Sequence, residues 1–422
     1  MRLRMPNRSS LRFALTKFGV GMIVVHGLLF WVTRQQLVSG SSDFRIFYTA
    51  GLILRRGEGH HLYNEQLQST VEREFASAAV AHGGPLPYNH PPFEAALYLP
   101  MTYLPYFSAY CIWVLINLLL LWASVYHVRS WLPTLMADFR WPLMLAPLAF
   151  FPIVNALLQG QDSILLLLLY CLAYAAFRRR EDSRAGVYLG FGLFKFHFIL
   201  PFALILLLHR RWRALLGMFV IAVLESAVSW AMVGGMQLFY YPHFVWQVNR
   251  QQAPGVIAPA NMPNLRGLFT GWQAMNPPPH WIEIALLATS LCLVFWASRQ
   301  WRPLEFGDAR GWDCGFSVCL VVVFLVGYHG YNQDMSFLLL PLLLALECVL
   351  DTWSKASSGL KLVLGLMFLT PLYLILILEF SHHNLFSIVL LFLVGYLAAS
   401  GAKAKPTASA NRSTTQLSAP LP

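Results

Sequence analysis

Charged residues are scarce in this chain: Asp, Glu, Lys and Arg make up 12% of its 422 residues, whereas hydrophobic residues make up 57%. A soluble globular protein carries about 25% charged residues, so this composition excludes an ordinary soluble domain and indicates an integral membrane protein. The formal net charge of +11 does not indicate nucleic-acid binding, because the basic residues are scattered between apolar runs and form no clustered stripe. No internal repeat is visible, which disfavours a transporter built from inverted halves.

Sequence signatures of metal and nucleotide chemistry are also missing. No two of the six cysteines have metal-ligand spacing, and most lie inside apolar runs, where buried structural thiols are expected. The chain has no glycine-rich phosphate loop, which disfavours a nucleotide-sugar donor. It also has no Asp-x-Asp motif or clear carboxylate cluster for a divalent ion. We therefore expect neither a cofactor nor a metal site.

The chain has instead a series of long apolar runs. A spanning helix needs about 20 apolar residues, and the candidate spans are 15–33, 106–126, 141–158, 162–177, 214–234, 281–298, 314–329, 335–350, 360–379 and 385–400. No Ala-x-Ala-like cleavage site follows the first run, so we interpret it as a retained helix whose N-terminus is cytoplasmic. In that frame the cytoplasmic segments hold most of the 30 Lys and Arg residues, as the positive-inside rule requires.

Residues 186–208 do not fit this alternation. Their charged flanks, 178–182 and 209–213, both favour the cytoplasm, yet 23 residues cannot comfortably cross a membrane twice. We predict two short half-helices that enter and return, with Lys195 at the bend. Irregular backbone at membrane depth has to be surrounded by protein or by a water-filled cavity, so Lys195 should face a cavity. The expected fold is an all-α, polytopic membrane protein with about ten transmembrane helices and this re-entrant pair.

The expected domain organisation is simple. One transmembrane domain covers residues 1–400, with two large outer segments at 34–105 and 235–280. The remaining residues, 401–422, are rich in Ala, Ser, Thr and Pro and cannot bury a core. We expect them to form a disordered cytoplasmic tail.

Several motifs between residues 40 and 345 occur in a recognisable order. They are 43–50 (DFRIFYTA), 88–93 (YNHPPF), 160–163 (GQDS), 186–195 (GVYLGFGLFK), 261–268 (NMPNLRGL) and 328–334 (YHGYNQD). Together they resemble the polyprenol-phosphate-sugar-dependent glycosyltransferases of family 87, in the type C superfamily. The chain departs from the pattern after Lys195. Many family members continue with proline there, whereas here Phe196 and His197 come well before Pro201.

The resemblance implies a hexosyltransferase that moves a sugar from a polyprenyl phosphate to an acceptor hydroxyl on a lipid or glycan. In mycobacterial relatives the sugar is mannose. The resemblance also implies inversion at the anomeric carbon, an extracytoplasmic active site, and a bacterial inner (plasma) membrane with both termini cytoplasmic. The partners would be the donor, the acceptor and the bilayer, without nucleic acid. A non-enzymatic transporter or flippase of lipid-linked sugars is the alternative, because it would also use an intramembrane lysine and a polar cavity.

The candidate site residues follow from this chemistry. The aspartate of the first outer loop is the family's expected catalytic base, which is Asp43 here, although aspartate also favours the N-cap of a helix at 44–55. His329 is the second catalytic candidate. Lys195 would bind the donor phosphate or be salt-bridged, since a charge in a spanning helix costs about 2.5–3.5 kcal/mol. The substrate-binding candidates are Arg45, Tyr48, His90, Gln161, Lys195, Asn261 and Asp334. Asp162 and Asp334 each precede an apolar run, where aspartate also suits the helix dipole.

Overall fold

The computed structural model describes residues 7–250, 258–271, 278–302, 309–353 and 356–403, and all regular structure within these ranges is helical. Eight helices are long and apolar enough to cross a membrane, or up to ten if each of two bent pairs is one span. The predicted all-α polytopic membrane fold is confirmed. Most of the predicted tail, residues 404–422, lies outside the described residues.

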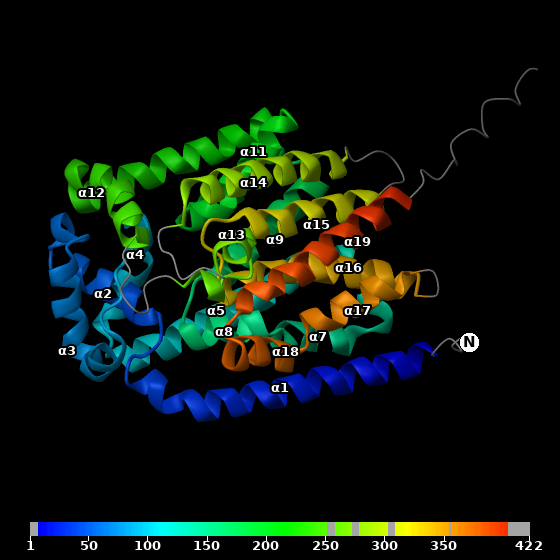
Figure 1. The fold of residues 1–422 in the computed structure, drawn as a ribbon, viewed down its shortest axis with the longest axis horizontal. Helices are drawn as coiled ribbons and strands as arrows, with labels where there is room; N and C mark the ends of the chain where they lie inside the picture. The colour runs from blue at the N-terminus through cyan, green and yellow to red at the C-terminus, as the bar shows by residue number, and fades with distance from the viewer. Residues whose placement is uncertain (1–6, 251–257, 272–277, 303–308, 354–355, 404–422) are drawn as a thin grey trace, which may run out of the picture.

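The predicted apolar runs coincide with the helices of one elongated bundle (Figure 1). The helices of the bundle are α1 (Arg8–Val38), α5 (Tyr106–Val128), α7 (Arg140–Ala149), α8 (Phe151–Gln159), α9 (Ser163–Arg178), α10 (Asp182–Gly190), η4 (Phe191–Lys195), α11 (Phe196–Leu208), α12 (Trp212–Arg250), α14 (His280–Gln300), α15 (Ala309–Val326), α16 (Leu339–Asp351), α17 (Ser358–Met367), α18 (Thr370–Leu374) and α19 (Phe386–Lys403).

The shorter elements connect these helices. They are α2 (Phe44–Arg55), η1 (Gly59–His61), α3 (Glu65–Gly83), α4 (Pro92–Tyr98), η2 (Leu99–Tyr103), η3 (Arg129–Trp131), α6 (Pro133–Asp138), η5 (Pro259–Asn261), α13 (Leu265–Thr270), η6 (Asn332–Leu338), η7 (Ile375–Glu379) and η8 (His383–Leu385). In Figure 1, α2 and α3 lie at the left, where α1 ends after running from the N-terminus at the right. We call this the α2–α4 end of the bundle, and the other the opposite end.

Prolines explain why two of the spans are bent. α7 and α8 meet at 46°, and the helix from Ser358 meets the one from Thr370 at 65°. Pro152 and Pro371 each stand in the first turn of the second helix. A proline has no N–H to donate to the preceding turn, so the hydrogen-bond ladder of the first helix is interrupted and a new helix begins in a new direction.

The segment from α10 to α11 enters the bundle and returns. It is helical over 27 residues and is one of the eight helices that are long enough to cross, but its two ends lie together. Arg211, just after α11, donates to the Asp182 carboxylate at the start of α10 over 3.0 Å. A Cβ built on Gly186 of α10 would lie 1.9 Å from the carbonyl oxygen of Ala214 near the start of α12. Lys195 therefore lies at the inner turn, as the predicted half-helix pair requires.

An aromatic core holds the first outer segment against the α2–α4 end of the bundle. Phe44 and Phe47 of α2 are fully buried, and the ring of Phe47 stacks on Tyr98 at a centroid distance of 4.5 Å. α12 continues past its predicted end across a kink at Gly234, where φ is +78°. His60 bonds to the carbonyl of Val233 there, with 2.9 Å between the atoms. These contacts fix the start of α2, which carries Asp43.

Candidate functional site

Asp43 lies where α2 touches the turn between α8 and α9. Gly160 makes this contact possible. Its φ of +64° is left-handed, and a Cβ there would lie 2.6 Å from the Cβ of Phe44. The close approach brings both neighbouring glutamines onto the aspartate. Gln159 accepts from the Asp43 backbone N–H over 3.2 Å, and Gln161 donates to the Asp43 carboxylate over 2.8 Å.

The structure separates the two roles that the sequence left open for Asp43. The residue occupies the N-cap position of α2, but its side chain makes no capping hydrogen bond. Burial raises the pKa of the Asp43 carboxyl, and the hydrogen bond from Gln161 and the charge of Arg45 oppose this effect. A half-buried carboxylate with a raised pKa is a better proton acceptor than an exposed one. The side chain is therefore available for chemistry and is not used to cap the helix.

Lys195 is held by two carboxylates. Its ammonium lies 2.7 Å from Asp334 and 3.1 Å from Asp162, and the lysine side chain is 5% exposed. The Asp334 carboxylate also accepts from the Ser163 hydroxyl over 2.9 Å and from the Tyr331 backbone N–H over 3.0 Å. Lys195 is thus ion-paired, which is one of the two roles that the sequence left open for it. With both aspartates ionised, the trio carries one net negative charge.

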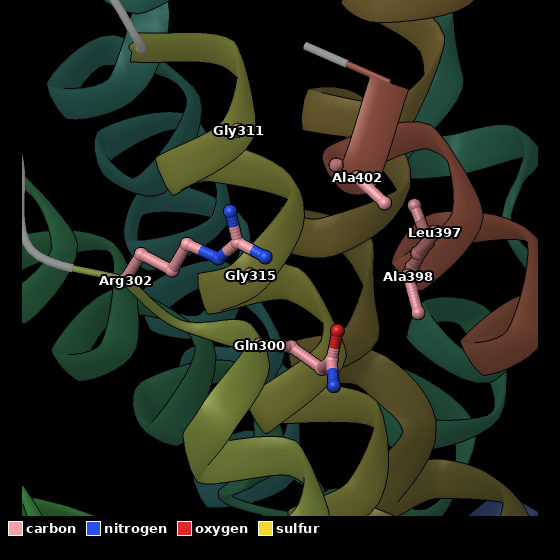
Figure 2. A pocket seen from close by; sticks show the side chains of 8 residues that line it. Gln300, Arg302, Gly311, Gly315, Leu397, Ala398 and Ala402 are labelled. Carbon is pink, nitrogen blue, oxygen red and sulfur yellow. The ribbon is translucent and has the colours of Figure 1, made fainter. Parts of the chain in front are cut away.

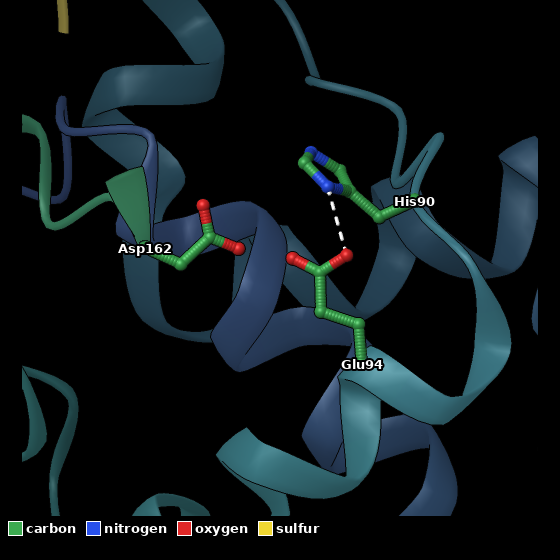
Figure 3. A group of neighbouring side chains, drawn as sticks. All are labelled: His90, Glu94 and Asp162. Atoms are coloured by element: carbon green, nitrogen blue, oxygen red, sulfur yellow. Dashed lines mark hydrogen bonds and ion pairs between the residues drawn. The ribbon is translucent and has the colours of Figure 1, made fainter. Parts of the chain in front are cut away.

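A second buried group adjoins this trio (Figure 3). His90, Glu94 and Asp162 place one ligand-type atom each within 4.8 Å of one another. Burial lowers the pKa of His90 to about 4. Burial, followed by the charge of Asp162, raises the pKa of Glu94 well above its ordinary value. His90 is therefore neutral at pH 7, and its Nδ1 lies 3.0 Å from Glu94 Oε2.

These residue types can bind a metal ion, but the surrounding charges favour a hydrogen-bonded group. The Lys195 ammonium already lies 3.1 Å from Asp162, so a divalent cation would share that carboxylate with a fixed positive charge. A protonated Glu94 can donate to Asp162, which makes a metal unnecessary for satisfying the buried oxygens. The expected independence from metals stays a prediction.

Two histidines and an arginine face the same region from other helices. The rings of His197 in α11 and His329 after α15 lie 6.1 Å apart, and the Nε2 atom of each is buried without a hydrogen-bond partner. Arg266 in α13 stacks over the ring of Tyr328 at 4.0 Å. Burial lowers the pKa of His329 well below its ordinary value, and the charge of Arg266 acts in the same direction. His329 is therefore neutral at pH 7.

Arg266 and Asp43 both act electrostatically on Tyr331. Burial raises the pKa of Tyr331 to about 12, which the charge of Arg266 opposes and that of Asp43 reinforces. Arg266 is 8% exposed and has no carboxylate partner among the described residues. Its hydrogen bond to the carbonyl of Tyr328 is long, at 3.4 Å. Within the described part of the chain, Arg266 is thus a buried cation that no carboxylate balances.

The remaining candidates from the sequence lie around this centre. Arg45 forms a buried ion pair with Glu72 at 2.7 Å and donates to the carbonyl of Gly84 over 3.0 Å. The Tyr48 hydroxyl donates to the carbonyl of Leu104 over 2.7 Å. Both side chains therefore have partners that hold α2 in place. Asn261 is exposed in η5, a few residues before α13.

Reasoning from the sequence missed Glu94, His197 and Arg266. Glu94 follows His90 at the i, i+4 spacing that pairs side chains on a helix, so a signal for it was present. For Arg266 the signal was local. Asn264 caps α13 by accepting from the Gly267 N–H over 2.8 Å. An asparagine cap two residues before the arginine predicts that Arg266 lies in the first turn of a short helix. No signal for His197 was recognisable beyond its place after Lys195.

Comparison with known protein families gives the chain a class. The model of glycosyltransferase family 87 matches residues 88–327, which is more than half of the chain. The chain belongs to glycosyltransferase family 87. The match confirms the resemblance drawn from the motifs, and it includes Glu94, Asp162, Lys195 and Arg266. Comparisons with curated proteins and with solved structures returned no match. As a family 87 member, the protein is a membrane glycosyltransferase.

Proposed function

We propose that this family 87 glycosyltransferase moves a hexose, mannose being the first candidate, from a polyprenyl phosphate to an acceptor hydroxyl, with inversion. The acceptor would be a lipid or glycan at the extracytoplasmic face of a bacterial inner membrane. One observation carries the proposal. The half-buried Asp43 carboxylate is held by Gln161 over 2.8 Å, and its surroundings raise its pKa.

Asp43 acts as the general base in a single displacement. It takes the proton from the acceptor hydroxyl while that oxygen forms a bond to the anomeric carbon. The bond between the anomeric carbon and the phosphate oxygen breaks on the opposite side, and its electron pair leaves with the polyprenyl phosphate. General base catalysis of this kind contributes about 10²–10⁴-fold to a rate. Gln161 fixes the orientation of the carboxylate.

Arg266 and His329 bind the departing phosphate. Arg266 is a buried guanidinium without a carboxylate partner among the described residues, and a phosphate would supply the missing anion through charge-assisted hydrogen bonds. The buried, unpartnered Nε2 of His329 adds a polar contact beside it. The trio of Lys195, Asp162 and Asp334 carries a net negative charge and would repel a phosphate.

Lys195 is therefore better assigned to positioning than to direct phosphate binding. Its two ion pairs join the start of α9, which carries Asp162, to η6, which carries Asp334. This places the turn with Gln161 next to Asp43. We retain His90, Asn261 and Asp334 as residues that line or support the substrate site. Arg45 and Tyr48 support it by fixing α2.

The family assignment sets aside the transporter or flippase alternative. Purified protein in nanodiscs, supplied with a panel of polyprenyl-phosphate sugars and acceptors, tests the proposed reaction. Release of polyprenyl phosphate that depends on both substrates supports it. Transfer only from a nucleotide sugar would contradict the proposed donor, and it would leave the family assignment intact.

A further inference from the structure

The opposite end of the bundle contains a cavity that the proposed reaction does not use. Its volume is about 660 Å³, and its lining comes from the end of α9, the α11–α12 connection and the start of α15. The lining residues are Phe177, Arg180, Asp182, His209, Arg210, Arg211, Trp212, Arg213 and Trp312. A cavity of this size accommodates a small ligand or a lipid headgroup.

The cavity is separate from the candidate active site. α9 connects the two, with Asp162 just before its first residue and Arg180 just after its last. A helix of 16 residues is about 24 Å long. α15 spans the same distance from Trp312 towards His329. A ligand in this cavity would therefore not contact Asp43 or Arg266.

The charge of the lining is strongly positive. It contains four arginines and one acidic residue, Asp182, which is already bonded to Arg211 at 3.0 Å. Arg180, Arg210 and Arg213 have no carboxylate partner among the described residues. No lysine is among the lining residues. Arginine presents a planar fork that matches phosphate geometry, whereas the positive-inside rule alone is satisfied by lysine or arginine.

Two of these arginines occupy backbone positions that normally favour glycine. Arg180 follows the end of α9 with a φ of +63°, and Arg210 follows the end of α11 with a φ of +55°. The described residues include only one other non-glycine residue with positive φ, Ser381. In each case the helix closes with the two hydrogen bonds of a Schellman motif. At the end of α9, Arg180 N–H donates to the carbonyl of Phe177 and Glu181 N–H to that of Ala176. At the end of α11, Arg210 N–H donates to the carbonyl of Leu207 and Arg211 N–H to that of Leu206.

Arginine at these two left-handed positions costs conformational free energy, and the fold alone does not require it. The position after a helix C-cap is usually glycine because a side chain there is strained. A left-handed conformation costs a non-glycine residue about 1–2 kcal/mol. Both strained positions carry arginine, and both arginines line the same cavity. Backbone strain of this kind clusters at ligand sites.

Aromatic side chains complete the wall. The guanidinium of Arg211 lies 4.6 Å from the ring centroid of Trp301 and 5.1 Å from that of Phe177, so its orientation is fixed before a ligand arrives. Trp212 is 61% exposed at the rim, which is typical of tryptophan at a membrane–water interface. A ligand with an anionic group beside an apolar part fits these surroundings.

A nearby cleft offers a useful contrast. Figure 2 shows it between α14, α15 and α19, lined by Gln300, Arg302 and mostly small residues. Its volume is about 20 Å³, which admits a water molecule but no headgroup. The arginine-rich cavity therefore has the space and the charge that this cleft lacks.

We propose that the arginine-rich cavity binds a phosphate group, supplied by an anionic phospholipid headgroup or by a soluble phosphate ester. Basic cavities of this kind between membrane helices bind anionic headgroups. The proposal does not depend on the reaction assigned to the Asp43 site.

Native mass spectrometry of the full-length protein in neutral detergent tests the proposal. Phosphatidylglycerol is titrated, with phosphatidylcholine as the zwitterionic comparison. The test variant is Arg180→Gly/Arg210→Gly, because glycine suits both backbone conformations and should preserve or raise the melting temperature. The control is Arg129→Gln/Arg140→Gln, which removes the same charge near the same end of the bundle, outside the cavity.

The test pair should bind phosphatidylglycerol about 25-fold more weakly, at about 5-fold for each arginine near a membrane surface. The control pair should bind like wild type. Arg213→Gln, in the exposed first turn of α12, should weaken binding about 5-fold and gives a second reading if the glycine pair folds poorly. Displacement of the lipid by millimolar inorganic phosphate or glycerol phosphate would identify a soluble ligand. Wild-type binding by both cavity variants, or an equal loss in the control pair, would overturn the proposal.

Discussion

Replacing Arg266 with glutamine should impair use of the polyprenyl-phosphate donor. The change removes a buried positive charge and keeps a polar, hydrogen-bonding side chain that is shorter. In the structure this guanidinium has one long hydrogen bond, 3.4 Å to the carbonyl of Tyr328, and no carboxylate partner among the described residues. Most of its five N–H donors therefore have no acceptor among the described residues, and the phosphate should be their main partner.

The expected loss in donor use follows from the environment of Arg266. A hydrogen bond to a charged group contributes about 1.5–3 kcal/mol, so losing one bond to the phosphate should lower kcat/KM for the donor about 10- to 150-fold. Arg266→Lys should recover part of the loss, because it restores the charge without the planar fork. The assay is release of polyprenyl phosphate in nanodiscs over a range of donor concentrations.

Arg55→Gln provides a matched control. Arg55 also bonds a backbone carbonyl, that of Thr102, and its guanidinium lies 5.4 Å from the ring centroid of Tyr103, but it is exposed and outside the site. It should retain wild-type kinetics. An unchanged donor kcat/KM in Arg266→Gln, or an equal loss in Arg55→Gln, would refute the assignment of Arg266 to the phosphate.

Three further predictions concern the base, the buried lysine and metals. Gln161→Leu removes the hydrogen bond that favours ionised Asp43, so the pKa of Asp43 should rise further. The acidic limb of the pH profile of kcat/KM should then move to higher pH. An unmoved limb would show that Gln161 does not tune the base. Lys195→Met leaves two buried carboxylates unpaired and should reduce stability by about 3–5 kcal/mol, with partial recovery in Lys195→Met/Asp334→Asn by thermal unfolding. If Lys195→Met has a normal melting temperature but binds the donor more weakly, Lys195 binds the donor phosphate directly. EDTA should leave turnover unchanged, whereas a loss restored by a divalent ion would make His90, Glu94 and Asp162 a metal site.

The fold could be predicted because each helix is encoded locally. Leu-rich runs such as the one in α5 are long enough to span a membrane, and prolines at 152 and 371 mark the bends. The hairpin around Lys195 also followed from local information, because basic residues flank it on both sides. Gly234 also lies where the span 214–234 was predicted to end. Its φ of +78° breaks the helix there, and a further helical stretch follows within the predicted outer segment.

The site was harder to predict because its contacts join distant parts of the chain. The motif order identified Asp43, Gln161 and Asp334, but it gave no distances between them. The pairing of Lys195 with Asp334 connects residues 139 positions apart, and no local pattern encodes such a contact. The same limit applies to Arg266. A count of charges assigned it to an outer segment. Only the packing of α13 shows that its guanidinium is buried, with no carboxylate of the described ranges paired to it.

Turnover and donor binding of Asp43→Asn, measured side by side, test the central claim most directly. The change deletes the base without altering its volume, and the asparagine oxygen can still accept from Gln161. The account predicts that release of polyprenyl phosphate falls about 10²–10⁴-fold while donor affinity and melting temperature stay close to wild type. Asp43→Asn with near wild-type turnover would contradict it.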